Sequence, residues 1–393
     1  MPLKILIIPD KFKGTLRAPA AARAMAKGWR RARPGDSLDL LPMTDGGDGF
    51  GEVIGRLLDA RPQRVKTVDA AHRPCVARWW WDAETKTAII ESAAVIGLAM
   101  LPPKKFHPFE LDTFGLGAVV RAATAQGAQR CLMGIGGSAT NDGGFGLARS
   151  LGWQLLDCSD NPIERWTDLD RLAKVRAPSG HRHGFRLTVA VDVKNPLLGP
   201  RGATRVYGPQ KGLRRTDFAH AERCLGRLAK VVKENFGCDL ARVPGAGAAG
   251  GLGFGLMAFL GAQLEPGFDL FARQASLDRR LQSSDLVVVG EGALDASTFM
   301  GKGVGQIAAL CRRQRIPCIA LGGVIRPEAR KRKLFAQMNG LTELTSVRQA
   351  RSKPAHWLER LATRVALDRS KDQRRNKSPI QPPQKSREMA KEI

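Results

Sequence analysis

The residues of this chain best suited to chemistry are lysines and carboxylates in loops that directly follow predicted strands. They are Asp10, Lys11, Lys13, Asp45, Asp48, Asp142, Asp192, Glu291, Asp295 and Lys302. Ligands of α/β sheets usually bind at the carboxyl ends of strands. Phosphoryl transfer needs cations and amides around phosphate, carboxylates that hold a metal ion, and a group that orients or deprotonates the acceptor hydroxyl. These residue types in these places favour phosphoryl transfer.

The most glycine-rich of these loops covers residues 134–144, with the sequence GIGGSATNDGG. Glycine lets a backbone turn tightly and approach a ligand closely, and a strand that ends in such a loop ahead of a helix offers a site for an anion. The expected anion ligands are the amides of Gly136 and Gly137 and the hydroxyls of Ser138 and Thr140. The side chains expected to face metal or substrate are Asn141 and Asp142. A turn that only connects strand to helix is the competing interpretation.

The same loop permits another interpretation, the dinucleotide site of an NAD(P)-dependent hydroxy-acid dehydrogenase. Gly134, Gly136 and Ala139 satisfy GxGxxA, and Asp157 follows at about the spacing of a ribose ligand. Against it, glycines 143 and 144 would weaken the first turns of the helix, and nearby acids would repel a pyrophosphate. The chain contains neither GxSxG nor GxxxxGK[ST]. A phosphotransferase here would therefore lack a P-loop.

Length and composition fit a globular protein of about two domains, with 393 residues of which 43% are hydrophobic. The net charge of +26 raises the alternative of a basic nucleic-acid-associated protein. The charge is spread along the chain without a nucleic-acid-binding motif, so no specific nucleic acid is expected. Seven cysteines without a CxxC pair predict free thiols and a cytoplasmic location. The glycine-rich run 245–264 predicts a buried helix rather than a membrane span.

Alternating strand and helix patterns predict an α/β fold. The expected strands cover residues 3–8, 37–41, 64–68, 76–81, 86–91, 131–133, 153–156, 186–191, 285–289 and 317–321. The expected helices include residues 16–32, 50–58, 92–100, 112–126, 217–236, 245–261, 301–314 and 354–367. The runs between residues 64 and 91 predict an antiparallel excursion. Charge, proline, glutamine and serine dominate from Arg369 onward and predict a disordered tail.

Seven ordered blocks resemble the bacterial glycerate kinase family, the type that lacks a P-loop. They are residues 9–16 (PDKFKGTL), 44–49 (TDGGDG), 134–144, 192–199 (DVKNPLLG), 208–212 (GPQKG), 245–253 (GAGAAGGLG), and 285–295 with 301–302. Their order and spacing cover residues 3 to about 325. The chain departs from the family pattern at Ala293, where a cationic residue is usual, and at Asp48, where glutamate is commoner.

The resemblance implies transfer of the ATP γ-phosphate, with Mg²⁺, to a hydroxyl of D-glycerate, giving ADP and 2-phosphoglycerate or 3-phosphoglycerate. It also implies two α/β domains with mostly parallel sheets and an active-site cleft between them. We expect one discontinuous domain over residues 1–62 and 284–368, a second over 63–283, and a disordered basic tail over 369–393. The oligomeric state stays open, a homo-oligomer included.

Within this interpretation, each candidate residue has an expected role. The catalytic residues are Asp192, Lys11 and Asn195, with Asp192 orienting or deprotonating the acceptor hydroxyl because it is a carboxylate at a strand's end. The expected metal ligands are Asp295, Glu291 and Asp142. The expected ligands of substrate or nucleotide are Asp10, Lys13, Asp45, Gly46, Gly47, Gly136, Gly137, Ser138, Thr140, Asn141, Gln210, Lys211 and Lys302. A helix cap or a surface ion pair is the competing interpretation for each acid.

Overall fold

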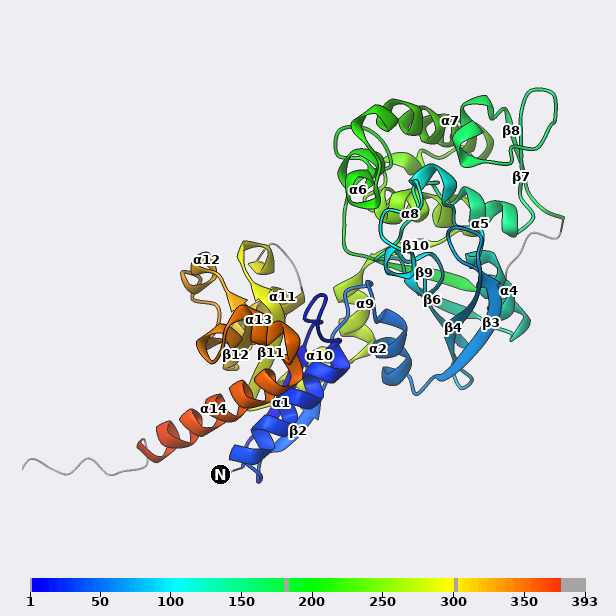
Figure 1. Ribbon diagram of the computed structural model, residues 1–393. Coiled ribbons are helices and arrows are strands. Elements are labelled where there is room, and N and C mark those ends of the chain that lie inside the picture. The colour runs from blue at the N-terminus through cyan, green and yellow to red at the C-terminus, as the bar shows by residue number, and fades with distance from the viewer. Residues whose placement is uncertain (1, 180–183, 300–302, 376–393) are drawn as a thin grey trace, which may run out of the picture.

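The computed structural model describes residues 2–179, 184–299 and 303–375 and contains two main sheets (Figure 1). The first sheet has the strand order β13-β12-β11-β1-β2, and every pair in it is parallel. Its strands are β1 (Lys4–Pro9), β2 (Ser37–Leu40), β11 (Leu286–Leu294), β12 (Cys318–Ile325) and β13 (Gln337–Gly340). The continuous apolar runs in β1 and β11 form central strands because helices cover both faces of a parallel sheet.

Two layers of helices bury the first sheet. Alternate residues of β1 point to opposite faces: Ile5 and Ile7 pack with α1 (Ala18–Ala32) and α14 (Pro354–Arg375). Leu6 and Ile8 belong to a second cluster with α11 (Gly303–Arg313). The other helices near this sheet are α12 (Pro327–Arg330) and α13 (Val347–Ser352).

The second sheet has the order β10-β9-β6-β5-β4-β3. Its strands are β3 (Arg61–Val68), β4 (Pro74–Asp82), β5 (Thr87–Glu91), β6 (Arg130–Gly134), β9 (Arg186–Val191) and β10 (Gln263–Pro266). The pairs from β10 to β5 are parallel, while β5, β4 and β3 are antiparallel. The antiparallel excursion expected between residues 64 and 91 is therefore present. A small antiparallel pair, β7 (Gln154–Leu156) and β8 (Lys174–Arg176), completes this part.

The remaining helices lie on and beside the second sheet, except the last of them, whose Arg280 pairs with Asp39 of β2 in the first sheet. They are α2 (Phe50–Leu57), α3 (Ala93–Ile96), α4 (Leu116–Ala125), α5 (Phe145–Ser150), α6 (Ala203–Lys211), α7 (Phe218–Phe236), α8 (Ala248–Leu260), α9 (Gly267–Gln274) and α10 (Leu277–Gln282). Figure 1 shows α2 and α9 between the two groups of elements. None of the helices in the described ranges is long and apolar enough to cross a membrane.

The α/β class with mostly parallel sheets is confirmed. The first sheet draws its strands from both ends of the chain, residues 4–40 and 286–340, and the second from residues 61–266. This distribution supports our proposal of a discontinuous domain over 1–62 and 284–368 and a second domain over 63–283. Two helices cross the proposed boundary: α2 packs on β4 and β5 of the second sheet, and Arg280 of α10 pairs with Asp39 of β2 in the first.

The structure also adds elements that the sequence did not predict. The short strands β10 and β13 were missed, and the expected helix 245–261 is left-handed at residues 249–251 before its regular turns begin. The final helix continues to Arg375, so residues 369–375 of the predicted disordered tail are helical. The rest of that tail, residues 376–393, lies outside the described residues.

The three consecutive tryptophans divide between the two faces of β4, and two glycines of α2 make room for one of them. Trp79 and Trp81 join the core beneath α4, whereas Trp80 packs against α2. A Cβ added to Gly51 of α2 would lie 1.9 Å from Cζ3 of Trp80. Glycine is therefore required for this close approach of helix to ring.

We predict that Gly51→Ala lowers the free energy of unfolding by about 1–3 kcal/mol because its methyl group overpacks this contact. Gly226→Ala is the matched control, because a Cβ at this position of α7 would meet only Leu198 Cδ1, 3.9 Å away. Helix propensity should then raise the stability of Gly226→Ala by about 0.5–1 kcal/mol. Denaturant titration of both variants measures the difference, and equal effects would contradict the packing argument.

Candidate functional site

Loops from the carboxyl ends of β2, β6 and β9 pack backbone against backbone. The Gly136 amide donates to the Gly46 carbonyl at 3.1 Å. A Cβ on Gly136 would lie 2.6 Å from Cα of Gly47, and one on Gly46 would lie 2.9 Å from the Ala190 carbonyl oxygen. Side chains at these glycines would push the loops apart, so the glycine pattern serves first to bring three strand ends together.

Glu91, which the sequence interpretation did not single out, fixes the start of α2. Its carboxylate accepts hydrogen bonds from the amides of Gly49 and Gly51 at 2.9 and 3.0 Å. Burial raises the pKa of Glu91 despite these bonds. The sequence does contain a signal for Glu91, because it is an acid at the end of a predicted buried strand. The other candidate acids were chosen for the same feature.

The centre of the site is a lysine between carboxylates that come from both sheets. Nζ of Lys11, after β1, lies 3.4 Å from Oδ1 of Asp45, after β2. The side chains of Asp45 and Asp192, after β9, are hydrogen-bonded to each other. Burial opposes the charge on Lys11, but the carboxylates of Asp45, Asp10 and Asp48 outweigh it and raise the pKa of the lysine. The sequence prediction that these strand ends meet is therefore consistent with the fold.

The two hydrogen-bonded carboxylates differ in their affinity for a proton. Desolvation by the surrounding protein and the adjacent charge of Asp45 raise the pKa of Asp192 to about 8. Burial disfavours ionisation of Asp45 too, but Lys11, the Gly47 amide and the bond from Asp192 together lower its pKa. Asp192 therefore holds the shared proton, and its side chain is exposed to solvent. A carboxyl group that titrates near neutral pH and is reachable from solvent is suited to acid–base work.

Asn195 lies three residues after Asp192 and is held at both ends of its amide. Its Nδ2 donates to the Arg201 carbonyl at 2.7 Å, and its Oδ1 accepts from the hydroxyl of Tyr207 at 2.6 Å. The sequence interpretation missed Tyr207. The available signals were its place directly before the GPQKG block and its being the single tyrosine of the chain.

The loop after β6 uses most of its polar groups within the protein. Ser138 and Thr140 are buried, and their hydroxyls lie 3.0 Å apart at hydrogen-bonding distance. The Thr140 carbonyl accepts from Nζ of Lys211 at 2.6 Å. The left-handed turn at the start of α8 packs closely against the same carbonyl. A Cβ added to Gly250 would lie 1.9 Å from its oxygen. The Gly136 amide, expected to bind an anion, is already bonded to Gly46.

Asp142, expected to face a metal or substrate, has a structural set of partners. Its Oδ2 accepts from the Thr113 amide at 2.9 Å, the Thr113 hydroxyl at 2.7 Å and the Gly146 amide at 2.9 Å. Burial and the neighbouring Asp112 raise the pKa of this carboxyl. Its three bonds tie the glycine loop to the segment before α4 and to the start of α5.

The other two expected metal ligands meet at the end of β11. The hydroxyl of Thr298 donates to Oε1 of Glu291 at 2.6 Å and accepts from the Asp295 amide at 3.2 Å. The Ser297 hydroxyl donates to Asp295 at 2.6 Å. Within the described ranges, no group of three or more His, Cys, Asp or Glu side chains is arranged to hold a metal ion. Asp142 is therefore not gathered with Glu291 and Asp295.

The remaining expected ligands lie near the rim of these loops. Asp10 is partly buried and accepts from the Lys11 amide at 2.7 Å, while Lys13 and Gln210 are exposed. Lys302 lies outside the described residues.

The geometry argues against a dinucleotide site at residues 134–139. The helix that follows, α5, begins only at Phe145, six residues after Ala139, so its amides do not follow the GxGxxA turn. Asp157, the expected ribose ligand, accepts from the Ser159 and Asn161 amides in an exposed turn of its own.

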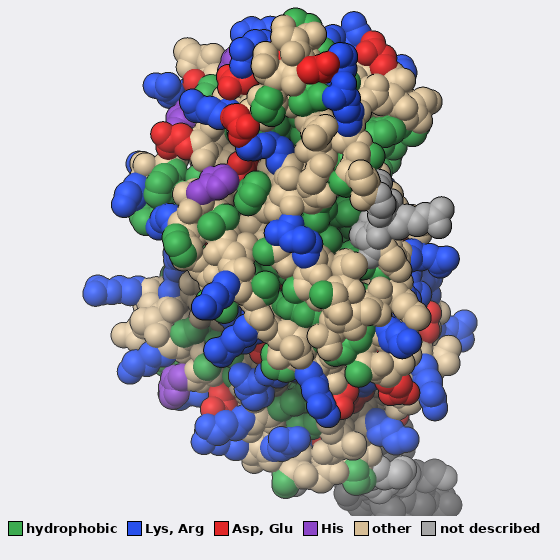
Figure 2. Space-filling model, turned by 90° about the vertical axis from the view of Figure 1, so that its right-hand side faces the viewer, with side chains coloured by type: hydrophobic (Ala, Val, Ile, Leu, Met, Phe, Trp, Pro, Cys, Tyr) green, Lys and Arg blue, Asp and Glu red, His purple; other side chains and the backbone are tan. Residues whose placement is uncertain are grey.

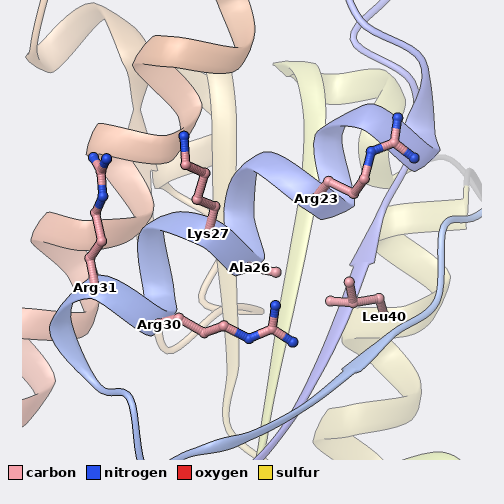
Figure 3. Close-up of a pocket in the computed structure, with 6 residues that line it drawn as sticks. All are labelled: Arg23, Ala26, Lys27, Arg30, Arg31 and Leu40. Carbon is pink, nitrogen blue, oxygen red and sulfur yellow. The ribbon is translucent and has the colours of Figure 1, made fainter.

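On one face of the molecule, the basic side chains of the described residues form no continuous stripe (Figure 2). Figure 2 shows Lys and Arg scattered over one face with Asp and Glu between them. A hollow of about 530 Å³ lies away from the expected ligands, lined by Arg23, Ala26, Lys27, Arg30, Arg31 and Leu40 (Figure 3). Two of its cations, Lys27 and Arg31, pair with Glu359 of α14. None of its lining residues was a predicted ligand.

Comparisons with known proteins agree on one family. Residues 5–369 match the model of the glycerate kinase family. A glycerate kinase of Halalkalibacterium halodurans is 38% identical over 81% of this chain and 85% of its own, and a glycerate 2-kinase of Escherichia coli is 34% identical over 82% and 85%. A crystal structure from Salmonella typhimurium LT2, provisionally named glycerate kinase 2, superposes with a TM-score of 0.81 at 30% identity, covering 95% of this chain and 100% of that one.

Lys211 gives the site a measurable pH dependence. Burial lowers the pKa of its amine to about 7, against the opposing charge of Asp142. Between pH 7 and 10 the unfolded chain therefore binds the proton that the folded chain has released, so the free energy of unfolding rises with pH, by up to about 1.4 kcal/mol per pH unit. We predict that Lys211→Met flattens this rise.

Urea titrations at pH 7, 8 and 9 measure the slope, with Lys230→Met as the matched control on the exposed side of α7. The control should keep the slope of the unchanged protein. A Lys211→Met variant with the same slope as its control would show that this lysine is not the buried titrating group.

Proposed function

The chain belongs to the glycerate kinase family and is a phosphotransferase with an alcohol group as acceptor; we propose that it phosphorylates D-glycerate with ATP and Mg²⁺. The observation that carries this proposal is the pair of hydrogen-bonded carboxylates beside Lys11, at the ends of strands from both sheets. A base of raised pKa next to a fixed cation is what transfer to a hydroxyl requires. The 2-hydroxyl is our proposed acceptor, rather than the 3-hydroxyl, because one relative is named a glycerate 2-kinase.

In the proposed mechanism, Asp192 takes the proton of the acceptor hydroxyl as its oxygen attacks the γ-phosphorus, and the bond from the γ-phosphorus to the β–γ bridging oxygen breaks to release ADP. Asp45 stays ionised because Lys11 and the Gly47 amide stabilise its charge, and its negative charge strengthens Asp192 as a base. Lys11 supplies positive charge where charge develops on the transferred phosphoryl group. Asn195, fixed by Arg201 and Tyr207, is proposed to orient the substrate beside Asp192.

Glu291 and Asp295 are the residues we propose to hold Mg²⁺. Together with the hydroxyls of Ser297 and Thr298 they form an all-oxygen donor set at one strand end, the donor type that Mg²⁺ prefers. Mg²⁺ is usually held by one or two carboxylates together with substrate phosphates, which fits a site of two acids. When bound, the ion neutralises charge on the phosphates. We leave Asp142 out of this set because its bonds hold the glycine loop.

Neither alternative function gains support from the site. The helix after the expected dinucleotide turn begins only at Phe145, and Lys and Arg are interspersed with Asp and Glu on the face shown in Figure 2. The seven cysteines are all free, which supports our proposal of a reducing, cytoplasmic location.

We predict that the purified protein, given ATP, Mg²⁺ and D-glycerate, releases ADP, and that ³¹P NMR identifies 2-phosphoglycerate. Magnesium removal by a chelator should stop the reaction, and restored Mg²⁺ should recover it. No ADP release with glycerate, together with NAD(P)H turnover on a hydroxy acid, would reject the kinase proposal.

We predict that Asp192→Asn lowers kcat by about 10²–10⁴-fold, since the amide cannot accept the proton. In the unchanged protein, kcat/KM should rise with pH through about 8, because Asp192 must be ionised and its pKa lies there. Asp157→Asn is the matched control, a partly exposed acid in a separate turn that should leave turnover unchanged. Near-normal turnover of Asp192→Asn would remove it from the mechanism.

A further inference from the structure

One face of α6 bonds to two different loops of the site. Thr204, Tyr207 and Lys211 are spaced three and four residues apart, which places them on the same side of a helix. Thr204 accepts from Nδ2 of Asn141 at 3.1 Å, and Lys211 donates to the Thr140 carbonyl at 2.6 Å. Both contacts hold the glycine loop after β6.

Tyr207, between these two residues, contacts the loop after β9 instead. Its hydroxyl donates to Oδ1 of Asn195 at 2.6 Å, and Nδ2 of Asn195 donates in turn to the Arg201 carbonyl at 2.7 Å. The Asn195 side-chain amide is therefore held in one orientation, by Tyr207 at its oxygen and by the Arg201 carbonyl, just before α6, at its nitrogen. The half-buried phenol of Tyr207 also lies close enough to Asp192 for the carboxylate charge to raise its pKa.

We propose that Tyr207 is a positioning residue for phosphoryl transfer, whose hydroxyl fixes Asn195 beside Asp192. The same face of α6 also bonds to the glycine loop after β6. Helix α6 therefore fixes the position of that loop relative to the loop after β9. This inference rests on the proposed function of the site. Phenylalanine would keep the packing of the ring and lose only the hydroxyl, so the substitution isolates the contact with Asn195.

Tyr207→Phe should lower kcat for glycerate phosphorylation about tenfold, the effect of one hydrogen bond, with little change in KM for ATP. Its midpoint of thermal unfolding should match that of the unchanged protein. Val206→Ala, at the exposed neighbouring position of α6, is the control and should keep full activity. An unchanged kcat in Tyr207→Phe would overturn the proposal.

A double-mutant cycle separates positioning from a general structural role. Tyr207 acts through Asn195, so Tyr207→Phe should have no further effect on kcat in an Asn195→Ala background. If the two fold-losses in kcat multiply in the double variant, the Tyr207 hydroxyl acts through a contact other than Asn195, and the proposal is overturned.

The contact can also be tested without turnover. Tyr207 is the single tyrosine of the chain, so tyrosinate absorbance reports this one group. Its desolvation and the Asp192 charge raise the pKa of Tyr207. Asp192→Asn should therefore lower the midpoint of the tyrosinate titration, whereas Asp157→Asn should leave it unchanged.

Equal midpoints in all three proteins would overturn the placement of Tyr207 beside Asp192. Absence of glycerate phosphorylation in the unchanged protein would reject the proposed function instead, and the titration would still decide the contact. The two failures are thus distinguishable.

Discussion

The site depends on a close approach of three backbones. Gly46 and Gly47 lie against Gly136 and against Ala190, at distances that leave no room for a Cβ. This contact places the residue before Gly46, Asp45, beside the residue that follows β9, Asp192. Carboxylates from two sheets therefore meet because the neighbouring glycines lack side chains, and the short side chains of Asp45 and Asp192 are long enough to bond to each other.

The approach also explains the electrostatics of the site. Two carboxylates in contact cannot both ionise freely, and the positive charge of Lys11 favours ionisation of one of them. Lys11 lies beside Asp45, so Asp45 keeps its charge and Asp192 keeps the proton. The asymmetry comes from Lys11 and the Gly47 amide beside Asp45 and from the desolvation of Asp192, and it gives two chemically identical groups different affinities for a proton.

The sequence predicted the elements that bury apolar runs, and its assignment of the chemistry to the ends of those strands stays a prediction. The strand over residues 186–191 agrees with β9 at both ends, because continuous apolar runs mark strands covered on both faces. The four-residue strands β10 and β13 lack such runs and depend on neighbouring strands for their pairing. Contacts between residues distant in sequence could not be predicted either. Asp142 was expected to face metal or substrate, but its carboxylate accepts a hydrogen bond from the Thr113 hydroxyl. No local sequence pattern links Tyr207 to Asn195.

The pairing of β1 with β11 sets an order for biosynthesis. Ile5 faces Leu286 across the central pair of the first sheet, whereas the second sheet is contiguous in sequence. At ribosomal rates of about 5–20 residues per second, β1 emerges on the order of ten seconds or more before its central partner. The apolar N-terminal strands must stay unaggregated over that interval while the middle of the chain folds. Premature release of a truncated chain would leave a complete second sheet attached to unpaired strands, a substrate for chaperones and proteases.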